Sequence, residues 1–179
     1  NKKKILGYWN LRAGKKMLKC TNDINLETNE INIFLSIIKN RKNVLDIGCG
    51  DGELLRNLKK KNKCNCYGID FSQNLIRVAK KKSKNINYYC IDMNEINKEF
   101  KIKTKFDYII TKRSIQNLIS WNDQKKFINQ LKFFSSPKTK ILLMESSNEG
   151  LKKINKMRNK LKLKKIIKPW HNLYLEDSK

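Results

Sequence analysis

Short apolar runs alternate with longer amphipathic segments along the chain. Five runs rich in β-branched, aliphatic or aromatic residues predict strands at Asn43 to Ile47, Cys64 to Ile69, Ile86 to Ile91, Phe106 to Thr111 and Thr139 to Glu145. Apolar residues at helical spacing predict helices at Leu26 to Lys39, Glu53 to Lys61, Ser72 to Lys82, Trp121 to Phe134 and Gly150 to Leu161. This alternation predicts an α/β fold, in which a Rossmann-like, doubly wound and mostly parallel sheet has helices on both faces.

The predicted fold also indicates where function lies. In open α/β sheets, ligands bind beyond the carboxyl ends of the strands, where the strand order reverses. Ser72 and Ser120 each precede a periodic segment and are predicted helix N-caps.

The 179 residues fit one domain, which we divide into an N-terminal helical or lid segment, 1–25, and a ligand-binding domain, 26–179. The sequence has no apolar stretch near the eighteen residues that a membrane span needs. The first residues also lack the apolar core of a secretion signal, so we expect a cytoplasmic protein.

The five cysteines are an odd number without a Cys-x-x-Cys pair, which predicts reduced thiols. With His171 as the one histidine, the spacing of these residues gives no indication of a metal site.

The chain is strongly basic, with 41 Lys and Arg against 16 Asp and Glu, a net charge of +25. Such a field attracts nucleic acid or an anionic membrane surface at low salt. However, the excess lies in Lys, Asn and Ile, whose codons are rich in A and T, and nucleic-acid recognition usually favours Arg. An AT-rich genome explains the charge without a partner, so nucleic-acid binding stays open but is not favoured.

The sharpest motif runs from Val44 to Leu54, where a buried strand leads into three glycines and then a helix. Glycines in such a turn permit positive φ angles or close approach of the backbone to a ligand. A P-loop is excluded because Glu53 and Leu54 replace its Lys and Ser or Thr. A dinucleotide fingerprint is disfavoured because Glu53 takes the place of its third glycine. The acidic loop suits a positively charged ligand without phosphates.

Residues Val44 to Gly52 resemble motif I of the class I S-adenosylmethionine-dependent methyltransferases. The resemblance implies S-adenosylmethionine as cofactor and S-adenosylhomocysteine as product. It also implies cofactor contacts from four residues of the loop, namely Asp46, Gly48, Cys49 and Gly50.

Further cofactor contacts are expected at the ends of the next strands. Asp70 lies about twenty residues after the glycine loop, where a carboxylate accepts both ribose hydroxyls, and Phe71 follows it. The resemblance implies that Asp92 contacts the adenine amino group and that Met93 packs on the adenine ring. The alternative for Asp92 is a structural role, because Asp commonly forms the turn at the end of a strand. Thr111 ends the fourth strand and is included among the cofactor contacts.

The signatures of several acceptor classes are absent. After the fourth strand there is no Asn/Asp-Pro-Pro-aromatic sequence, no Pro-Cys pair and no acidic residue of a ribose-methylating tetrad. The segments Arg113 to Trp121, Met144 to Ser146 and Trp170 to Asn172 look like bacterial methyltransferases of sugar or surface-polysaccharide pathways. This resemblance implies a small-molecule acceptor hydroxyl or amine. An RNA methyltransferase and a noncatalytic binding module that keeps the fold remain alternatives.

Five residues complete the predicted site. Arg113 and Glu145 are expected to orient the substrate, unless they form a salt bridge at the rim. His171 titrates near neutrality and is the candidate general base, although a lone histidine is more often structural. Tyr8 and Arg12 are expected in a lid, where Arg12 pairs with the cofactor carboxylate; the alternative is a helix packed on the sheet.

The family's sheet has seven strands, in the order 3-2-1-4-5-7-6, whereas this chain predicts five. The fifth strand would then be an exposed edge that invites self-association. We therefore expect a fragment of a longer enzyme, truncated at its C-terminal end, as the absent initiator Met also indicates.

Overall fold

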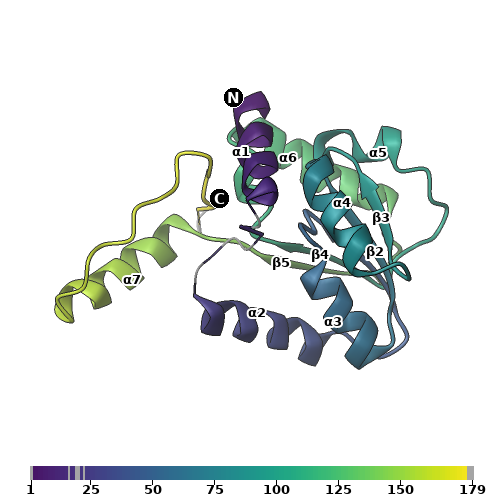
Figure 1. The fold of residues 1–179 in the computed structure, drawn as a ribbon, viewed down its shortest axis with the longest axis horizontal. Helices are drawn as coiled ribbons and strands as arrows, with labels where there is room; N and C mark the ends of the chain where they lie inside the picture. Colours follow the sequence, from purple (N-terminus) through teal and green to yellow (C-terminus); the bar gives the residue numbers. More distant parts are fainter. Residues whose placement is uncertain (1, 16, 19–20, 22, 177–179) are drawn as a thin grey trace.

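Five parallel strands form one sheet in the order β3-β2-β1-β4-β5, as a computed structural model of the chain shows (Figure 1). The structure describes residues 2–15, 17–18, 21 and 23–176. The strands are β1 (Asn43–Ile47), β2 (Asn65–Asp70), β3 (Asn87–Cys90), β4 (Tyr108–Lys112) and β5 (Lys140–Met144). The predicted fold class is confirmed. The strand order reverses beside β1, which places the ligand site at the carboxyl ends of β1, β2 and β4.

Helices cover both faces of this sheet. One face carries α2 (Ile24–Ile37), α3 (Glu53–Asn62) and α4 (Gln73–Lys82), and the other carries α5 (Ile96–Glu99) and α6 (Trp121–Gln130). Helix α1 (Lys2–Gly14) packs on α4, and α7 (Asn148–Lys160) leads away from β5 (Figure 1). The described residues also form three 3₁₀ turns, namely η1 (Met93–Glu95), η2 (Ile115–Asn117) and η3 (Leu131–Phe133).

Successive side chains of the central strand β1 point alternately into two hydrophobic cores, one on each face of the sheet. Val44 belongs to the cluster beneath α2 and α3, whereas Leu45 and Ile47 belong to the cluster beneath α6; all three are fully buried. Side chains on successive strand positions point to opposite faces, so an apolar strand of this kind must be covered on both sides. Burial of each such side chain stabilises the fold by about 2 kcal/mol.

Side-chain caps explain where two of the helices begin. The Ser72 hydroxyl accepts the backbone N–H of Leu75 at 3.3 Å, which confirms this predicted cap. Asp23 caps α2 through the N–H of Leu26 at 2.9 Å, so α2 begins earlier than predicted and the boundary at residue 25 falls inside its first turn. Ser120 occupies the N-cap position of α6 as predicted, although its side chain makes no capping hydrogen bond.

Strand β5 is the last strand of the sheet within the described residues. Its side chains Ile141 and Leu143 are each 44% exposed. The exposed edge agrees with the expectation from the sequence, while self-association through it stays a prediction. None of the helices in the described ranges has the length and apolar character that a bilayer crossing requires.

Candidate functional site

The loop after β1 adopts the backbone conformation that its glycines allow. Gly48, Gly50 and Gly52 have φ angles of 83°, 56° and 79°, a region that other residues rarely adopt. The backbone N–H groups of Gly48 and Cys49 both donate to the carbonyl of Ile69, at 2.7 and 2.9 Å. The loop therefore lies against the end of β2 and turns its backbone toward the carboxyl edge of the sheet.

Two of these glycines face different surroundings. A Cβ atom at Gly48 would lie 2.2 Å from the Cβ of Ser114, so the loop is packed directly against the residue that follows β4. A Cβ atom at Gly50 would meet nothing within 4 Å. Gly50 therefore borders open space on the side where a ligand can approach its backbone.

Asp70, at the end of β2, is fixed by the glycine loop and by α4. Its Oδ2 accepts the N–H of Gly50 at 2.9 Å, and its Oδ1 accepts the N–H of Ser72 at 2.8 Å. Burial raises the pKa of Asp70 to about 6, and these two backbone hydrogen bonds oppose that rise. Because each carboxylate oxygen can accept a second hydrogen bond, Asp70 can still bind two donors from the pocket.

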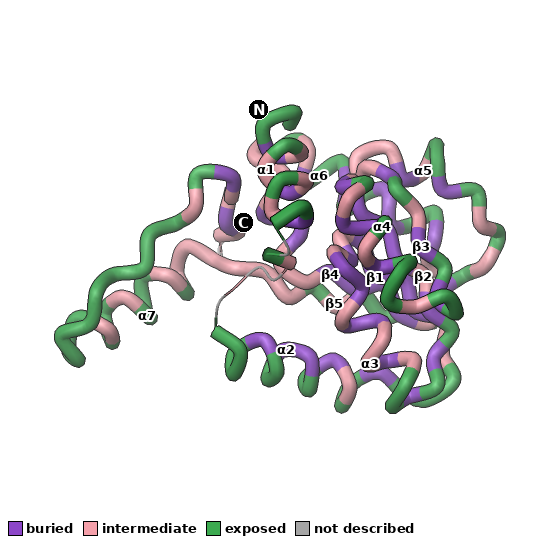
Figure 2. Tube along the Cα trace, in the orientation of Figure 1, coloured by how far each residue is buried: buried purple, intermediate pink, exposed green. Residues whose placement is uncertain are grey.

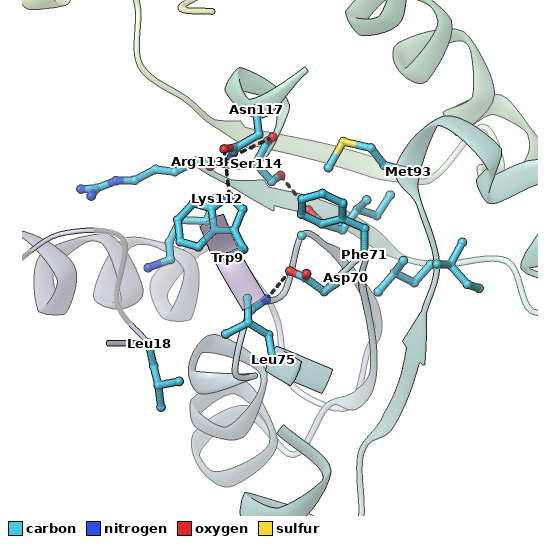
Figure 3. Close-up of a pocket in the computed structure, with 15 residues that line it drawn as sticks. Trp9, Leu18, Asp70, Phe71, Leu75, Met93, Lys112, Arg113, Ser114 and Asn117 are labelled. Carbon is cyan, nitrogen blue, oxygen red and sulfur yellow. Dashed lines mark hydrogen bonds between the residues drawn. The ribbon is translucent and has the colours of Figure 1, made fainter. Parts of the chain in front are cut away.

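A pocket lies directly above these groups (Figure 3). Its floor and walls come from the glycine loop, the β2 and β3 ends, the start of α4 and the loop after β4. The lining residues are Trp9, Leu18, Ile47, Gly48, Gly50, Ile69, Asp70, Phe71, Leu75, Ile91, Met93, Lys112, Arg113, Ser114 and Asn117. The structure thus brings Gly48, Gly50, Asp70, Phe71, Met93 and Arg113 of the predicted set into one pocket.

A second cavity, of about 290 Å³, adjoins the first and shares Phe71, Met93 and Asn117 with it. Asp92 lines this cavity, caps η1 through the N–H of Asn94 at 2.8 Å and forms an ion pair with Lys2. The turn-former interpretation of Asp92 is therefore confirmed, while its contact with the cofactor stays a prediction.

Helix α1 forms the roof of the pocket. The Trp9 indole lines the pocket and donates its Nε1–H to Oδ1 of Asn117 at 3.2 Å. On the other side of the pocket, Oδ1 of Asn10 accepts the Ser72 hydroxyl at 2.7 Å. Since Ser72 follows β2 and Asn117 follows β4, α1 bridges both walls, as expected of a lid.

Tyr8 and Arg12, predicted in the lid, face away from the pocket lining. The Tyr8 ring stacks on the His171 ring at 4.4 Å between centroids, and the Arg12 guanidinium lies over the Tyr8 and Trp9 rings at 5.5 and 5.8 Å. His171 is 6% exposed, and burial, followed by the Arg12 charge, lowers the pKa of His171. The three residues hold α1 against the C-terminal segment, and none of them lines either cavity.

Two cations at the end of β4 are matched by carboxylates of α2. The Lys112 Nζ lies 3.2 Å from Oε1 of Glu27, and the Arg113 guanidinium lies 2.5 Å from Oε1 of Glu30. Both glutamates are buried, so their charges face these cations rather than water. Arg113 has a φ angle of 56°, and strained residues of this kind occur often at functional sites. The neighbouring salt bridge that was the alternative for Arg113 is therefore present.

Glu145 lies beneath the loop after β4 rather than in the pocket. Its Oε1 accepts the N–H groups of Ser114 and Ile115, at 3.0 and 3.1 Å, and its Oε2 accepts that of Gln116 at 3.3 Å. Burial raises the pKa of Glu145, while these amides oppose the rise. Glu145 therefore fixes the loop that carries Asn117, and it is not among the residues that line the pocket.

Three predicted cofactor contacts lie behind the pocket. Cys49 belongs to the core beneath α3, and burial raises the pKa of its thiol well above the usual value. Thr111 is fully buried, and Asp46 is 2% exposed. The other loop acid, Asp51, pairs with Lys82 at 2.6 Å and Arg56 at 3.4 Å, so its charge is already compensated and the expectation of an acidic loop is weakened.

Asp46 makes the stability of the chain depend on pH. Burial raises the pKa of Asp46 to about 7, with Asp70 adding to the rise and Lys112 opposing it. The folded state therefore holds a proton that the unfolded chain releases near pH 4, and stability falls as pH rises from about 4 to 7. Asp46→Asn should raise the free energy of unfolding at pH 8 by about 2–4 kcal/mol, with little change at pH 4. Urea denaturation at both pH values measures this; an equal effect at both would contradict it.

Nine of the fifteen lining residues were not predicted as cofactor or substrate contacts, namely Trp9, Leu18, Ile47, Ile69, Leu75, Ile91, Lys112, Ser114 and Asn117. Trp9 and Asn117 occur in segments that the sequence singled out, but their contact joins residues 108 positions apart. No periodicity indicates such a contact. Within the described ranges no cluster of three metal-ligating side chains occurs, and the cysteines seen there are not in disulfides, while Cys20 lies outside those ranges.

Comparison with known proteins assigns the chain to a family. Residues 38–176, from the end of α2 to the C-terminal segment, match the family described as "Methyltransferase domain". The chain belongs to that family. S-adenosylmethionine is the cofactor of this methyltransferase domain, and the matched residues include β1, its glycine loop and Asp70.

Three similar proteins illustrate the relationship. The "Ubiquinone biosynthesis O-methyltransferase" of Coxiella burnetii is 36% identical over 106 residues, which are 57% of this chain and 42% of that protein. The solved "DhpI-SAH complex structure" has a TM-score of 0.66 at 14% identity and covers 82% of this chain and 69% of that one. N-methyltransferase NodS from Bradyrhizobium japonicum, solved with S-adenosyl-l-homocysteine, has a TM-score of 0.60 at 18% identity, over 75% and 71%. The chain thus spans about two fifths of the Coxiella protein.

The residues that line the pocket fit the chemistry of S-adenosylmethionine. Asp70 presents two carboxylate oxygens that are fixed by backbone N–H groups and have acceptor capacity left for a pair of hydroxyls. Phe71, Leu75 and Met93 supply apolar surface for a flat ring. The open space beside Gly50 leaves the loop backbone free to approach a ligand.

Proposed function

We propose that this domain transfers the methyl group of S-adenosylmethionine to a hydroxyl or amine of a small-molecule acceptor. When bound, the cofactor supplies an electrophilic methyl group on a sulfonium. The observation that carries the proposal is the roof of the pocket, where Trp9 and Asn117 join α1 to the loop after β4. A pocket that is roofed in this way suits a small acceptor better than a polymer.

The chain contributes positioning and exclusion of water, which are the main requirements of an in-line displacement. Asp70 and the glycine loop would hold the cofactor, while Trp9 and Met93 would keep water from its apolar surface. We further propose that Arg113 contacts the acceptor, because it lines the pocket while Glu30 fixes its guanidinium. Glu145 would act through the loop that it holds, as a positioning residue.

His171 remains the proposed general base. Burial, followed by the Arg12 charge, lowers the pKa of His171, which favours the neutral imidazole that a general base requires, and its Nδ1 has no hydrogen-bond partner among the described residues. His171 reaches the pocket only through Tyr8 and Trp9, so α1 must shift for direct contact with an acceptor.

The substitution His171→Asn tests this role. We expect about a 10²-fold fall in kcat, with loss of the acid limb of the pH–rate profile and unchanged cofactor affinity. The matched variant Trp170→Phe, at a neighbouring exposed position, should retain the pH profile. A His171→Asn enzyme with the wild-type pH profile would assign the histidine to the packing of α1 instead.

A labelled-methyl transfer assay tests the proposed function. Folded chain is incubated with methyl-labelled S-adenosylmethionine and separate pools of phenols, sugar nucleotides, small amines and RNA. We expect label in a small-molecule pool and none in RNA at 150 mM salt, where nonspecific phosphate contacts weaken. Transfer to RNA that persists at that salt would favour the RNA alternative, and no transfer to any pool by a cofactor-binding sample would favour a noncatalytic module.

A further inference from the structure

Residues 148–170, which comprise α7 and the segment that returns from it, form an extension here called the basic arm. The arm leads away from the sheet at the end of β5, and its surface is exposed or half-buried along its length (Figure 2). Helix α7 contributes no buried residue, and residues 161–168 are all exposed. The other long helices of the described chain each bury at least one face against the body of the protein.

The basic arm carries two kinds of side chain that rarely share an exposed surface. It has nine Lys and Arg against one acidic residue, Glu149. It also exposes seven large apolar side chains, by 39% to 85% of their surface, namely Ile154, Met157, Leu161, Leu163, Ile166, Ile167 and Trp170. Exposed apolar side chains gathered in one segment mark an interaction site.

These side chains are ordered on the helix rather than mixed. Leu151, Ile154, Met157 and Leu161 recur every three or four residues and so form one stripe along α7. Lys152, Lys153, Lys156 and Lys160 lie on the opposite side of the helix by the same spacing. An apolar stripe combined with a lysine-rich polar face is the pattern of helices that lie in a membrane interface.

Hydrogen bonds hold the two halves of the basic arm together. Asn155 exchanges two side-chain hydrogen bonds with the backbone of Ile166, at 2.8 and 2.9 Å. The Arg158 Nε donates to the carbonyl of Lys164 at 2.7 Å. The returning segment therefore runs beside α7 as a fixed unit, and its lysines and aliphatic residues add to those of the helix.

Charge and residue type distinguish between three possible binding partners of the basic arm, namely a second copy of the chain, nucleic acid and a lipid surface. The arm of a second copy of the chain would place nine more cations against this surface. Electrostatic repulsion disfavours such a contact in a chain of net charge +25. Nucleic acid matches the charge but gives no cover to aliphatic side chains, and the basic arm offers one aromatic ring for base stacking. An anionic lipid surface matches both the charged and the apolar side chains of the arm. Its headgroups neutralise lysines, while the boundary with the acyl chains accepts Ile, Leu, Met and Trp.

We propose that the basic arm docks this domain on an anionic membrane surface. The apolar stripe enters the boundary between headgroups and acyl chains, and the lysines extend along their stems to the lipid phosphates. Docking is reversible, because the arm is short and its affinity depends on charge as well as on apolar area. At the root of the arm, the Trp170 ring packs edge-to-face on the Tyr8 ring of α1, at 6.0 Å between centroids, so docking would take place beside the pocket roof.

Vesicle cosedimentation of the full chain tests this proposal. Vesicles of phosphatidylcholine alone are compared with vesicles that contain about one third phosphatidylglycerol, at low and physiological salt. We expect binding to the anionic vesicles, little to the neutral ones, and weaker binding as salt rises. Two arm variants are expected to lower the partition coefficient about tenfold or more, the charge-neutral Met157→Gln/Leu161→Gln/Ile167→Gln and the lysine variant Lys152→Gln/Lys153→Gln/Lys156→Gln.

Matched controls remove the same side chains elsewhere. Ile24→Gln/Ile33→Gln/Phe133→Gln removes three exposed apolar side chains, and Lys59→Gln/Lys60→Gln/Lys61→Gln removes three lysines of α3. Both should retain most of the binding, and circular dichroism should show all four variants folded. Equal losses in arm and control variants would overturn the proposal in favour of diffuse charge. Absence of vesicle binding, or RNA binding that the apolar substitutions leave unchanged, would overturn it as well.

Discussion

Replacing Asp70 by alanine should weaken S-adenosylmethionine binding by about 10²–10³-fold. The carboxylate of Asp70 is fixed by the N–H groups of Gly50 and Ser72, at 2.9 and 2.8 Å, and so presents its remaining acceptor sites in one orientation. Each hydrogen bond to a charged group contributes about 1.5–3 kcal/mol, and alanine removes the two that a pair of ligand hydroxyls would make. Equilibrium dialysis with labelled cofactor measures the change.

Two further variants separate recognition from folding. Asp70→Asn keeps the size of the side chain and one acceptor oxygen, so we expect an intermediate loss of about tenfold. Asp107→Asn alters a carboxylate at the opposite end of the sheet, where it accepts Lys42 and the N–H of Asn43, and should leave affinity unchanged. Wild-type affinity in a folded Asp70→Ala sample would remove the carboxylate from the cofactor site.

Replacing Gly48 by alanine should destabilise the fold by about 2–5 kcal/mol. Its φ angle of 83° is costly for any residue with a Cβ, by about 1–2 kcal/mol. The new Cβ would also lie 2.2 Å from the Cβ of Ser114, and overpacking of this kind costs about 1–3 kcal/mol more. Urea denaturation measures the difference, and Gly7→Ala, in α1 with no atom within 4 Å, should be neutral or stabilising.

The clash itself can be tested by a double-mutant cycle. Ser114→Gly removes the obstructing Cβ, at the cost of the hydrogen bond from its hydroxyl to the Ile47 carbonyl at 2.7 Å. The double variant should therefore be more stable than the sum of the two single changes predicts, by at least about 1 kcal/mol. Additivity within about 0.5 kcal/mol would show that the loop relaxes away from Ser114.

The sheet and its ligand edge were predictable because local signals agree there. The central strand, Asn43–Ile47, is an apolar run covered on both faces, and its observed bounds equal the predicted ones. The glycine loop combines turn geometry with a following helix, and an acid at the end of the next strand then falls beside it, since parallel neighbours end at one edge. This reasoning located Gly48, Gly50 and Asp70 in the observed pocket.

Side-chain direction and long-range pairing were not predictable from the pattern. Glu145 and Arg113 both follow strands at the correct edge. Yet Glu145 turns under the loop to accept three backbone N–H groups, while Arg113 lines the pocket but pairs with Glu30 of α2. The roof contact between Trp9 and Asn117 joins distant segments. Such choices depend on which partner satisfies each buried polar group in three dimensions, and a strand pattern does not encode them.

The most direct test of the central claim is calorimetric titration of S-adenosylhomocysteine into the wild-type chain. We expect one binding site per chain with micromolar affinity, because Asp70, the glycine loop and the apolar walls already lie in one pocket. A sample with the expected helical circular dichroism that releases no binding heat at several temperatures would contradict the account.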